Sequence, residues 1–214
     1  MSTDLRRVGI FGGTFDPPHI GHLILAAEAR DELHLDQVLW VVTPDPPHKT
    51  GRTISPLAVR LALVQAALAQ DASFEISRIE IDRPGPHYSV DTVRLLEREN
   101  PGADLYYLMG GDSLHDLPAW VRPQEFVDCL AGIGVMRRPQ DFVDLSWLER
   151  ALPGIVDKVH FVNAPLLEIS STSIRERIAR GNHYRYFLPP AVFEIIQAKK
   201  LYRSSPCRGE ATRP

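Results

Sequence analysis

What this chain has in short supply excludes several classes of protein. Its 214 residues include only 2 cysteines, and Cys129 and Cys207 stand at no spacing typical of a zinc site or a redox pair. No apolar run approaches the roughly 20 residues that a membrane-spanning helix needs. Positive charge is not in excess either: the formal net charge is −3, whereas nucleic-acid-binding proteins usually carry a basic stripe. We therefore expect neither a membrane nor a nucleic acid as a partner.

The two ends of the chain carry little pattern. Residues 1–7 form a short polar segment without the features of a signal peptide. Together with cysteines that fit reduced thiols, this segment predicts a cytoplasmic protein. Residues 204–214 are polar and have no periodicity, so we expect a loose tail there. The chain is 44% hydrophobic and can bury a full core, and its length predicts a single domain over residues 1–203.

The motif around which we organise the chain lies near its start. Residues 6–11 are rich in apolar side chains and predict a buried strand. Gly12 and Gly13 follow, where the backbone can turn sharply and can approach a ligand closely. From Ile20 to about residue 34, apolar residues fall at helical spacing. A strand, a glycine turn and a helix N-terminus together predict a binding site for an anion.

Two histidines mark the beginning of this helix. His19 and His22 stand one helical turn apart and therefore share a face. With the hydroxyl of Thr14, they can donate hydrogen bonds to an oxygen at the helix mouth. Two other interpretations stay open. One is a helix cap with a packed imidazole, and the other is a metal-binding pair, although no third ligand stands at a recognisable spacing.

A second anion site is predicted near the other end of the chain. Residues 169–175 read Ile-Ser-Ser-Thr-Ser-Ile-Arg, and we expect a helix over 173–180. Arg175, in the first turn of that helix, can hold two phosphate oxygens in its planar fork. An ordinary capped helix start would explain this segment on its own. Combined with the first site, it predicts a ligand that carries several phosphates.

Strands alternate with helices along the whole chain. Apolar runs bounded by turn residues predict strands over 6–11, 37–43, 74–81, 103–109, 131–136 and 158–162. Helical periodicity falls between them and after them. This order predicts an α/β protein with a Rossmann-like, open, mostly parallel twisted sheet and helices on both faces. In such a fold the ligand lies outside the carboxyl ends of the strands, where the strand order reverses.

These motifs resemble those of a known superfamily and of one family within it. Residues 12–22 are similar to the signature of nucleotidyltransferases with an H-x-G-H motif, which move a nucleoside monophosphate from a triphosphate to an acceptor. Further segments resemble the bacterial nicotinate mononucleotide adenylyltransferases in the same order, namely 46–49, 83–92, 111–120 and 169–175. The likeness extends over nearly the whole chain.

The resemblance implies a reaction and its catalytic residues. The acceptor phosphate of nicotinate mononucleotide would attack the α-phosphorus of ATP in line, giving deamido-NAD and pyrophosphate in NAD biosynthesis. His19 and His22 would sit on the α-phosphate and the bridging oxygens, and Arg175 would hold the leaving pyrophosphate. The nucleophile is already an anion, so no general base is expected. Mg²⁺ would bridge the phosphates with few or no protein ligands.

The resemblance also implies which residues contact ATP, and it implies that the C-terminal helices, about 170–200, close that site. The expected set is Gly12, Gly13, Thr14, Phe15, Gly111, Asp112, Arg138, Ser171 and Thr172. Asp112 can accept hydrogen bonds from ribose hydroxyls and can also cap a short helix, and the two roles are compatible. Arg138 adds positive charge after the fifth strand. We expect Arg83, by contrast, to be structural.

For the acceptor, the expected contacts are His48, Lys49, Tyr88, Ser89 and Trp120. The indole of Trp120 can stack on a flat pyridine ring, or it can fill the core. Tyr88 and Ser89 open a helix whose N-terminus would favour the nicotinate carboxylate. The family more often has threonine in place of Ser89, and serine keeps the hydroxyl. His48 and Lys49 either contact the phosphate or ribose of the acceptor or lie in a solvated loop.

Three rival functions remain to be weighed. A related transferase could act on another phosphate, such as phosphopantetheine or glycerol phosphate, but segments 83–92 and 111–120 argue against it. A regulatory module that binds the nucleotide without turnover is disfavoured by the intact His19, His22 and Arg175. Class I aminoacyl-tRNA synthetases share H-x-G-H, but this chain is too short for one. A homo-oligomer and the degree of preference for nicotinate over nicotinamide mononucleotide stay open.

Overall fold

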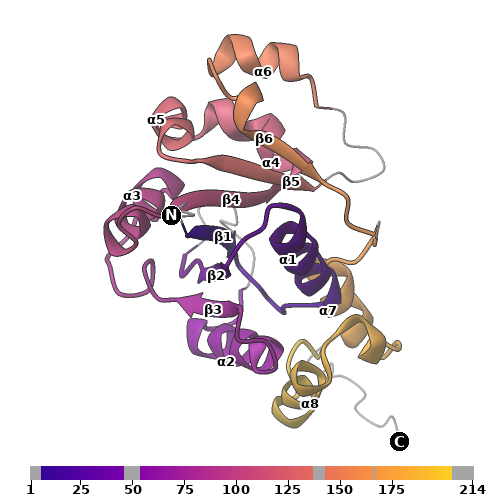
Figure 1. Ribbon diagram of the computed structural model, residues 1–214. Coiled ribbons are helices and arrows are strands. Elements are labelled where there is room, and N and C mark those ends of the chain that lie inside the picture. The colour runs from indigo at the N-terminus through magenta and orange to yellow at the C-terminus, as the bar shows by residue number, and fades with distance from the viewer. Residues whose placement is uncertain (1–5, 46–53, 137–142, 166, 204–214) are drawn as a thin grey trace, which may run out of the picture.

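The fold is built on one open sheet of parallel strands. The computed structural model describes residues 6–45, 54–136, 143–165 and 167–203 (Figure 1). Its 6-stranded sheet has the order β3-β2-β1-β4-β5-β6. The strands are β1 (Arg7–Gly13), β2 (Gln37–Val42), β3 (Phe74–Ser77), β4 (Asp104–Gly110), β5 (Gly132–Met136) and β6 (Val159–Val162). Every pair of neighbouring strands in this sheet is parallel, so the predicted Rossmann-like α/β class is confirmed.

The strand order reverses in the middle of the sheet. The chain starts at β1, moves outward through β2 to β3, and returns to the other side of β1 at β4. The loops that leave the carboxyl ends of β1 and β4 therefore diverge and leave room between them. In an open α/β sheet this is where a ligand is expected.

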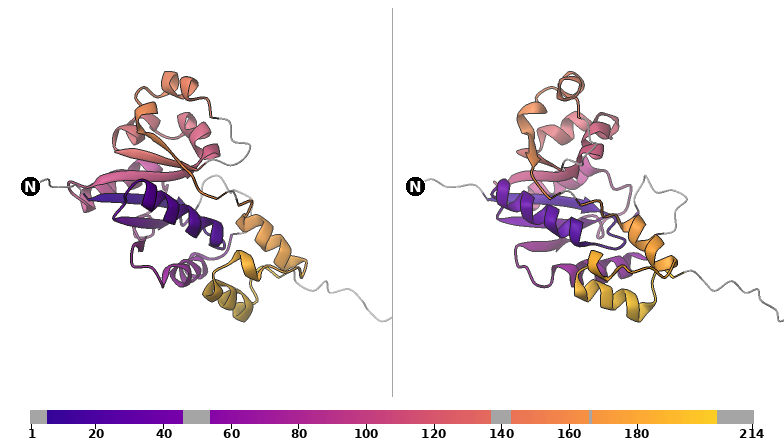
Figure 2. Two further views of the ribbon diagram at one scale, coloured as in Figure 1. Left: turned by 45° about the vertical axis from the view of Figure 1, so that its right-hand side comes forward. Right: turned by 90° about the vertical axis from the view of Figure 1, so that its right-hand side faces the viewer.

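Two apolar layers sandwich the sheet because successive side chains point to opposite faces. In β1, Val8 and Ile10 belong to one cluster and Phe11 to the other. The first cluster is completed by α3 (Ser89–Glu99), α5 (Pro123–Asp128) and α6 (Leu145–Ala151), and the second by α1 (Ile20–Glu32) and α2 (Leu57–Leu68). Figures 1 and 2 show these helices around the sheet. Burial on both faces explains the continuous apolar run of β2, whose Trp40 is completely buried.

The C-terminal helices form a third apolar cluster on the outside of α2. They are α7 (Ser171–Ala179) and α8 (Pro190–Lys199). Ile174 of α7 and Val192 of α8 pack with Leu63 of α2, and all three side chains are fully buried. Figures 1 and 2 show this C-terminal part beside α2 at the end of the chain. The cluster fixes α7 against α2, whose Val64 and Leu68 belong to the apolar layer on the sheet.

The structure differs from the sequence-based expectation in the bounds of several elements and in one additional helix. The strand expected over 74–81 ends at Ser77, because after the four residues paired with β2 the amides of Ile81 and Asp82 turn back onto the carbonyl of Arg78. The helix α7 begins at Ser171 rather than at 173. The helix α6 was not predicted. None of the helices that the structure describes is long and apolar enough to cross a membrane.

Candidate active site

The glycine loop after β1 is held by close contacts that exclude side chains. A Cβ on Gly12 would lie 2.9 Å from the hydroxyl oxygen of Tyr107, and one on Gly13 would lie 2.8 Å from the ring of Phe15. Phe15 adopts a left-handed backbone, with φ 49°. Its ring is buried and packs 4.9 Å from that of Trp40, measured between centroids. Phe15 was expected in the nucleotide site, and its side chain belongs to the core, which leaves its main chain to face a ligand.

The two histidines of the motif stack on each other at the start of α1. Their ring centroids lie 3.6 Å apart and their planes differ by 21°. The backbone N–H of His19, the N-cap residue, donates to Nδ1 of His22 at 3.2 Å. Because that nitrogen accepts, the proton of a neutral His22 sits on Nε2, which is then a donor. The capping interpretation is therefore correct for this pair.

The glycine inside H-x-G-H has a packing reason. A Cβ on Gly21 would lie 3.2 Å from Nδ1 of His19 and 3.7 Å from Cβ of Ile169. The imidazole and the approach of the C-terminal segment thus both use the space that glycine leaves open. Nδ1 of His22 is used by the backbone N–H of His19, so a metal ion could use only Nε2 of that ring.

The two predicted anion sites meet in the structure. The hydroxyl of Ser171, at the start of α7, donates to the carbonyl of Pro17 at 2.8 Å. Arg175 donates through Nη1 to the carbonyl of Asp16 at 2.7 Å and through Nη2 to Oγ1 of Thr172 at 3.2 Å. Since α7 begins at Ser171, Arg175 lies in its second turn and not in the first, as we had expected.

Ser170, not one of the later hydroxyls, caps α7. Its Oγ accepts from the backbone N–H of Ser173 at 3.1 Å, and Oγ of Ser173 accepts in return from the backbone N–H of Ser170 at 3.4 Å. This box satisfies groups at the helix start. The hydroxyls of Ser171 and Thr172 contact Pro17 and Arg175 instead, and their expected contact with ATP stays a prediction.

A cavity of about 220 Å³ opens where the strand order reverses. Its lining includes Gly12 from β1, Tyr107 from β4 and Trp120 from the turn that follows η2 (Leu117–Ala119). Asp112 and Ser113 line it from α4 (Gly111–Asp116). Residues predicted separately for ATP and for the acceptor therefore share one space, which agrees with the expected position of the ligand.

Asp112 is exposed at the rim of this cavity and is not the helix cap. Gly110 occupies the N-cap position of α4, and Oδ1 of Asp112 accepts from the N–H of Ser113 at 2.9 Å. The carboxylate is acceptor-only when ionised, which suits it to hydroxyl groups of a sugar. The capping alternative for Asp112 is wrong.

Trp120 both packs against the core and faces the cavity. Its ring meets Tyr107 edge to face with centroids 6.2 Å apart, and it lies 5.3 Å from the ring of Phe126. The side chain is partly buried. Aromatic neighbours thus hold the indole in place, and Trp120 also lines the cavity.

Tyr107 is a site residue that the sequence analysis missed. Its hydroxyl forms a hydrogen bond with Ser89, the first residue of α3. Burial raises the pKa of Tyr107 to about 12, against a weaker opposite effect of that hydrogen bond. Tyr107 therefore stays a neutral phenol and ties the glycine turn to the start of α3. Tyr88 holds the N-cap position of α3, and Ser89 follows it as the first helical residue.

The loop before α3 is braced from within. Arg83 donates to the carbonyl of Pro86 and to Oγ1 of Thr92, each at 3.0 Å. Thr92 in turn donates to Oε1 of the buried Glu80 at 2.7 Å. The guanidinium of Arg83 is occupied with the protein's own groups, as its expected structural role requires.

Three expected contact residues lie outside the described part of the chain, namely His48, Lys49 and Arg138. Their roles stay predictions. Within the described residues, no group of three or more His, Cys, Asp and Glu side chains is arranged to hold a metal ion.

The chain is similar to known proteins over almost its whole length. The cytidylyltransferase-like family matches residues 10–177. A curated protein of Thermomicrobium roseum, named "Probable nicotinate-nucleotide adenylyltransferase", is 47% identical over 200 residues, which are 94% of this chain and 93% of that protein. A relative of the same name from Roseiflexus sp. is 43% identical over 196 residues, covering 92% of this chain and 98% of its own.

Solved structures share the fold at lower identity. The Plasmodium falciparum nicotinic acid mononucleotide adenylyltransferase complexed with NaAD superposes with a TM-score of 0.76 at 17% identity, covering 92% of this chain and 97% of that one. The complex of the Plasmodium falciparum protein with APC gives a TM-score of 0.71 at 18% identity, again with 92% and 97% coverage. At this level of identity the likeness shows a common architecture.

Proposed function

The chain belongs to the nicotinate-nucleotide adenylyltransferase family, and on this premise we propose that it transfers AMP from ATP to nicotinate mononucleotide. A phosphate oxygen of the mononucleotide attacks the α-phosphorus of ATP. The bond from that phosphorus to the oxygen that bridges it to the β-phosphorus breaks, and pyrophosphate leaves with the electron pair. The products are deamido-NAD and pyrophosphate.

One observation carries the proposal: the two predicted anion sites lie against each other beside the cavity. The hydroxyl of Ser171 contacts the carbonyl of Pro17, and Arg175 contacts the carbonyl of Asp16, so α7 sits over the loop that follows Gly12 and Gly13. A triphosphate placed there meets donors from both ends of the chain. We propose that residues 1–203 act as one domain, in which the helices of residues 170–200 close the ATP site.

The phosphate groups meet a set of hydrogen-bond donors and no general base. Nε2 of His22 donates to the α-phosphate with His19 beside it. Arg175 keeps its contact with the carbonyl of Asp16 and donates further N–H groups to the oxygens of the departing pyrophosphate. The hydroxyls of Thr14, Ser171 and Thr172 complete the cradle. Donors aimed at developing negative charge stabilise the transition state without any proton transfer by the protein.

The acceptor is held by stacking and by the start of α3. The indole of Trp120 stacks on the pyridine ring, and the N-terminal end of α3 after Tyr88 faces the nicotinate carboxylate. An anion gains more from a helix N-terminus than a neutral carboxamide does. Asp112 accepts from ribose hydroxyls. Ser89 is oriented by Tyr107, so the acceptor subsite rests on a fixed hydroxyl pair.

A divalent cation accompanies ATP in this reaction, and we propose Mg²⁺. The oxygen atoms of the triphosphate and water suit it as ligands, and it would neutralise phosphate charge. Protein donors at the site, led by Arg175 and the histidine pair, are cationic or neutral and complement such a metal-bound phosphate rather than ligate the ion. We further propose a cytoplasmic location, where the nucleotide substrates are available.

The experiment measures pyrophosphate release from ATP and Mg²⁺ with nicotinate mononucleotide and, in parallel, with nicotinamide mononucleotide. Rapid release with the acid and slow release with the amide supports the reaction and the recognition of the carboxylate at the start of α3. Equal release with both retains the transferase and removes that recognition argument. No release with either, while ATP still binds, overturns the proposed acceptor.

A further inference from the structure

Asp16, in the loop that follows the glycine turn, accepts hydrogen bonds through both its side chain and its main chain. Asp16 is almost fully buried. Its Oδ1 accepts from the hydroxyl of Tyr202 at 2.6 Å, and its Oδ2 accepts from the backbone N–H of Ser55 at 3.0 Å. Its main-chain carbonyl accepts from Nη1 of Arg175 at 2.7 Å. Two residues of the C-terminal part of the chain, Tyr202 and Arg175, thus donate hydrogen bonds to Asp16 of the first motif.

Tyr202 is directed to this point by a sharp turn after α8. Lys200 and Tyr202 have left-handed backbones, with φ 51° and φ 61°. The N–H of Leu201 closes the helix onto the carbonyl of Ile196 at 3.1 Å. The chain therefore reverses immediately after α8, and the phenol reaches back to Asp16. Residue 202 lies beyond residues 10–177, which the cytidylyltransferase-like family matches.

The surroundings keep the Tyr202 hydroxyl a donor. Burial, the hydrogen bond to Asp16 and the charge of Asp16 all raise the pKa of Tyr202, while the Ser55 hydroxyl and the charge of Arg175 act in the opposite sense. The neutral phenol is therefore stable at working pH.

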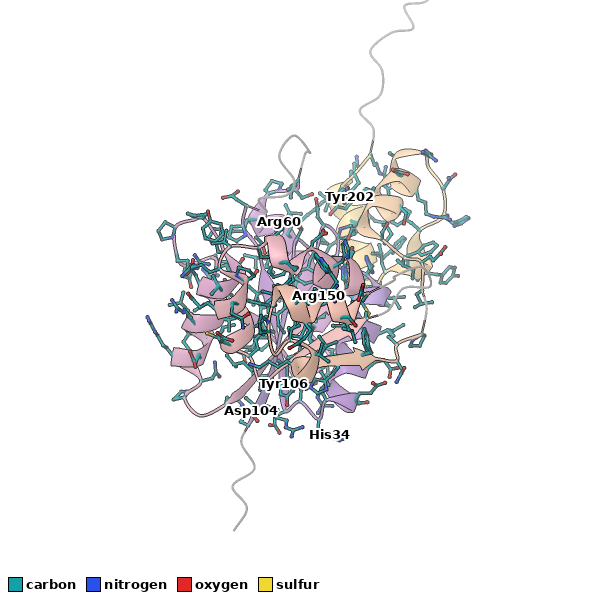
Figure 3. All side chains as sticks on the ribbon, turned by 90° about the horizontal axis from the view of Figure 1, so that it is seen from above. His34, Arg60, Asp104, Tyr106, Arg150 and Tyr202 are labelled. Carbon is teal, nitrogen blue, oxygen red and sulfur yellow. The ribbon has the colours of Figure 1, made fainter. Side chains whose placement is uncertain are left out.

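A buried arginine completes the arrangement from α2. Arg60, only 1% exposed, donates to the carbonyls of Thr14, Thr43, Pro44 and Ser55 at 3.0, 2.8, 2.7 and 3.0 Å. It thereby ties the loop after β1 to the loop after β2. Burial lowers the pKa of Arg60, and the charge of Asp16 opposes that effect. Figure 3 places Arg60 and Tyr202 at the end of the molecule opposite His34 and Asp104.

We propose that Tyr202 and Asp16 are positioning residues for ATP: together they form a latch that holds the loop of residues 14–18 and Arg175 in register with each other. The latch acts on Arg175, which contacts the phosphates in the proposed function, so the inference rests on that function. Without the Tyr202 hydroxyl, Asp16 loses a partner and the loop whose carbonyl holds Arg175 gains freedom. Part of the ATP binding energy is then spent on ordering it.

The test compares Tyr202→Phe with Tyr184→Phe. Tyr184 lies in the same C-terminal segment and its hydroxyl accepts from Nε2 of Gln197 at 2.7 Å, away from the loop of residues 14–18. Each variant loses one hydroxyl and keeps its ring. The readouts are the Kd for ATP with Mg²⁺ in an equilibrium titration without acceptor, the KM for each substrate, and the Tm.

We expect Tyr202→Phe to raise the Kd and the KM for ATP about tenfold, the size of effect that a lost hydrogen bond to a charged group can produce. The KM for the acceptor should change less than about twofold, and Tyr184→Phe should leave ATP binding unchanged. An unaltered Kd for ATP in Tyr202→Phe, with a loss of Tm like that of Tyr184→Phe, overturns the latch. The titration contains no acceptor, so failure of the proposed acceptor would leave this result standing.

Discussion

His19 and His22 stack as two nearly parallel imidazoles with centroids 3.6 Å apart, and the backbone N–H of the first donates to Nδ1 of the second at 3.2 Å. This geometry lets the same pair cap a helix and present a donor. The cap uses one nitrogen of His22, and the other carries the proton of the neutral ring. Capping and catalysis are therefore not competing explanations for the motif.

Removing the donor should cost turnover more than stability. For His22→Ala we predict a fall in kcat of roughly 10²–10³, the range measured when one donor to a developing oxyanion is removed. The lost cap should lower the free energy of unfolding by about 1 kcal/mol. Steady-state kinetics and urea unfolding measure the two effects. The control is His183→Ala, because His183 is an exposed histidine after α7. A kcat at the wild-type level in His22→Ala would remove His22 from the mechanism.

Trp120→Ala should act on the acceptor. Losing a stacked aromatic ring costs about 1–3 kcal/mol of binding, so the KM for nicotinate mononucleotide should rise about tenfold or more while the KM for ATP stays nearly constant. Trp147→Ala removes an exposed tryptophan on α6 and serves as the control. Weaker ATP binding with an unchanged acceptor KM would contradict the stacking role.

Tyr107→Phe should show what the hydrogen bond between Tyr107 and Ser89 contributes to acceptor binding, apart from the packing of the ring. The variant keeps the edge-to-face contact with Trp120 and loses the hydrogen bond to Ser89. A neutral hydrogen bond contributes about 1 kcal/mol, so we predict a roughly fivefold higher KM for the acceptor. Tyr106→Phe, on the same strand, is the matched control. If the KM values for both substrates stay at the wild-type level, Tyr107 does not position the acceptor subsite.

Stability should decline at high pH because of two buried phenols. The pKa of Tyr107 is raised to about 12, and that of Tyr202 is raised as well. Unfolded tyrosine ionises near pH 10. Below pH 10 the buried tyrosines make their full contribution to the free energy of unfolding. Between pH 10 and 12 the unfolded chain gives up protons that the folded chain retains. The free energy of unfolding therefore falls by at most about 1.4 kcal/mol per pH unit for each tyrosine.

Urea unfolding at pH 8, 10 and 11 measures this decline. Comparison with Tyr107→Phe and Tyr202→Phe separates the effect of the tyrosines on stability from that of lysines, which titrate in the same pH range. Each variant should show a shallower loss of stability above pH 10 than the wild type does. Parallel curves for all three proteins would mean that the phenols do not retain their protons on folding.

Local patterns predicted the parts of the site that lie within one segment. Residues 12–22 and 169–175 can be recognised from the sequence alone, because a glycine turn, a helix start and hydroxyl groups occur together within a few positions. Tyr202 and Arg60 carry no such signal. Tyr202 reaches Asp16 across 186 positions of sequence, and a buried arginine in an apolar helix face becomes meaningful only when the folded chain brings four carbonyls around it.

In the fold, too, features set by local patterns were predicted, and a feature that depends on a distant partner was not. The sheet and its parallel order follow from apolar runs alternating with helical periodicity, and they were predicted correctly. The end of β3 was not, because Ile79 and Ile81 continue the apolar pattern while pairing with β2 stops at Ser77. Strand length there depends on the partner strand, which no local pattern records.

The most direct test of the central claim follows the α-phosphorus of ATP. The protein is incubated with Mg²⁺, nicotinate mononucleotide and ATP labelled at the α-phosphate, and the products are separated. Attack on that phosphorus predicts that the label appears in the dinucleotide and that pyrophosphate is released unlabelled in equal amount. Label recovered as AMP, or remaining in ATP after complete incubation with active protein, would contradict adenylyl transfer to this acceptor.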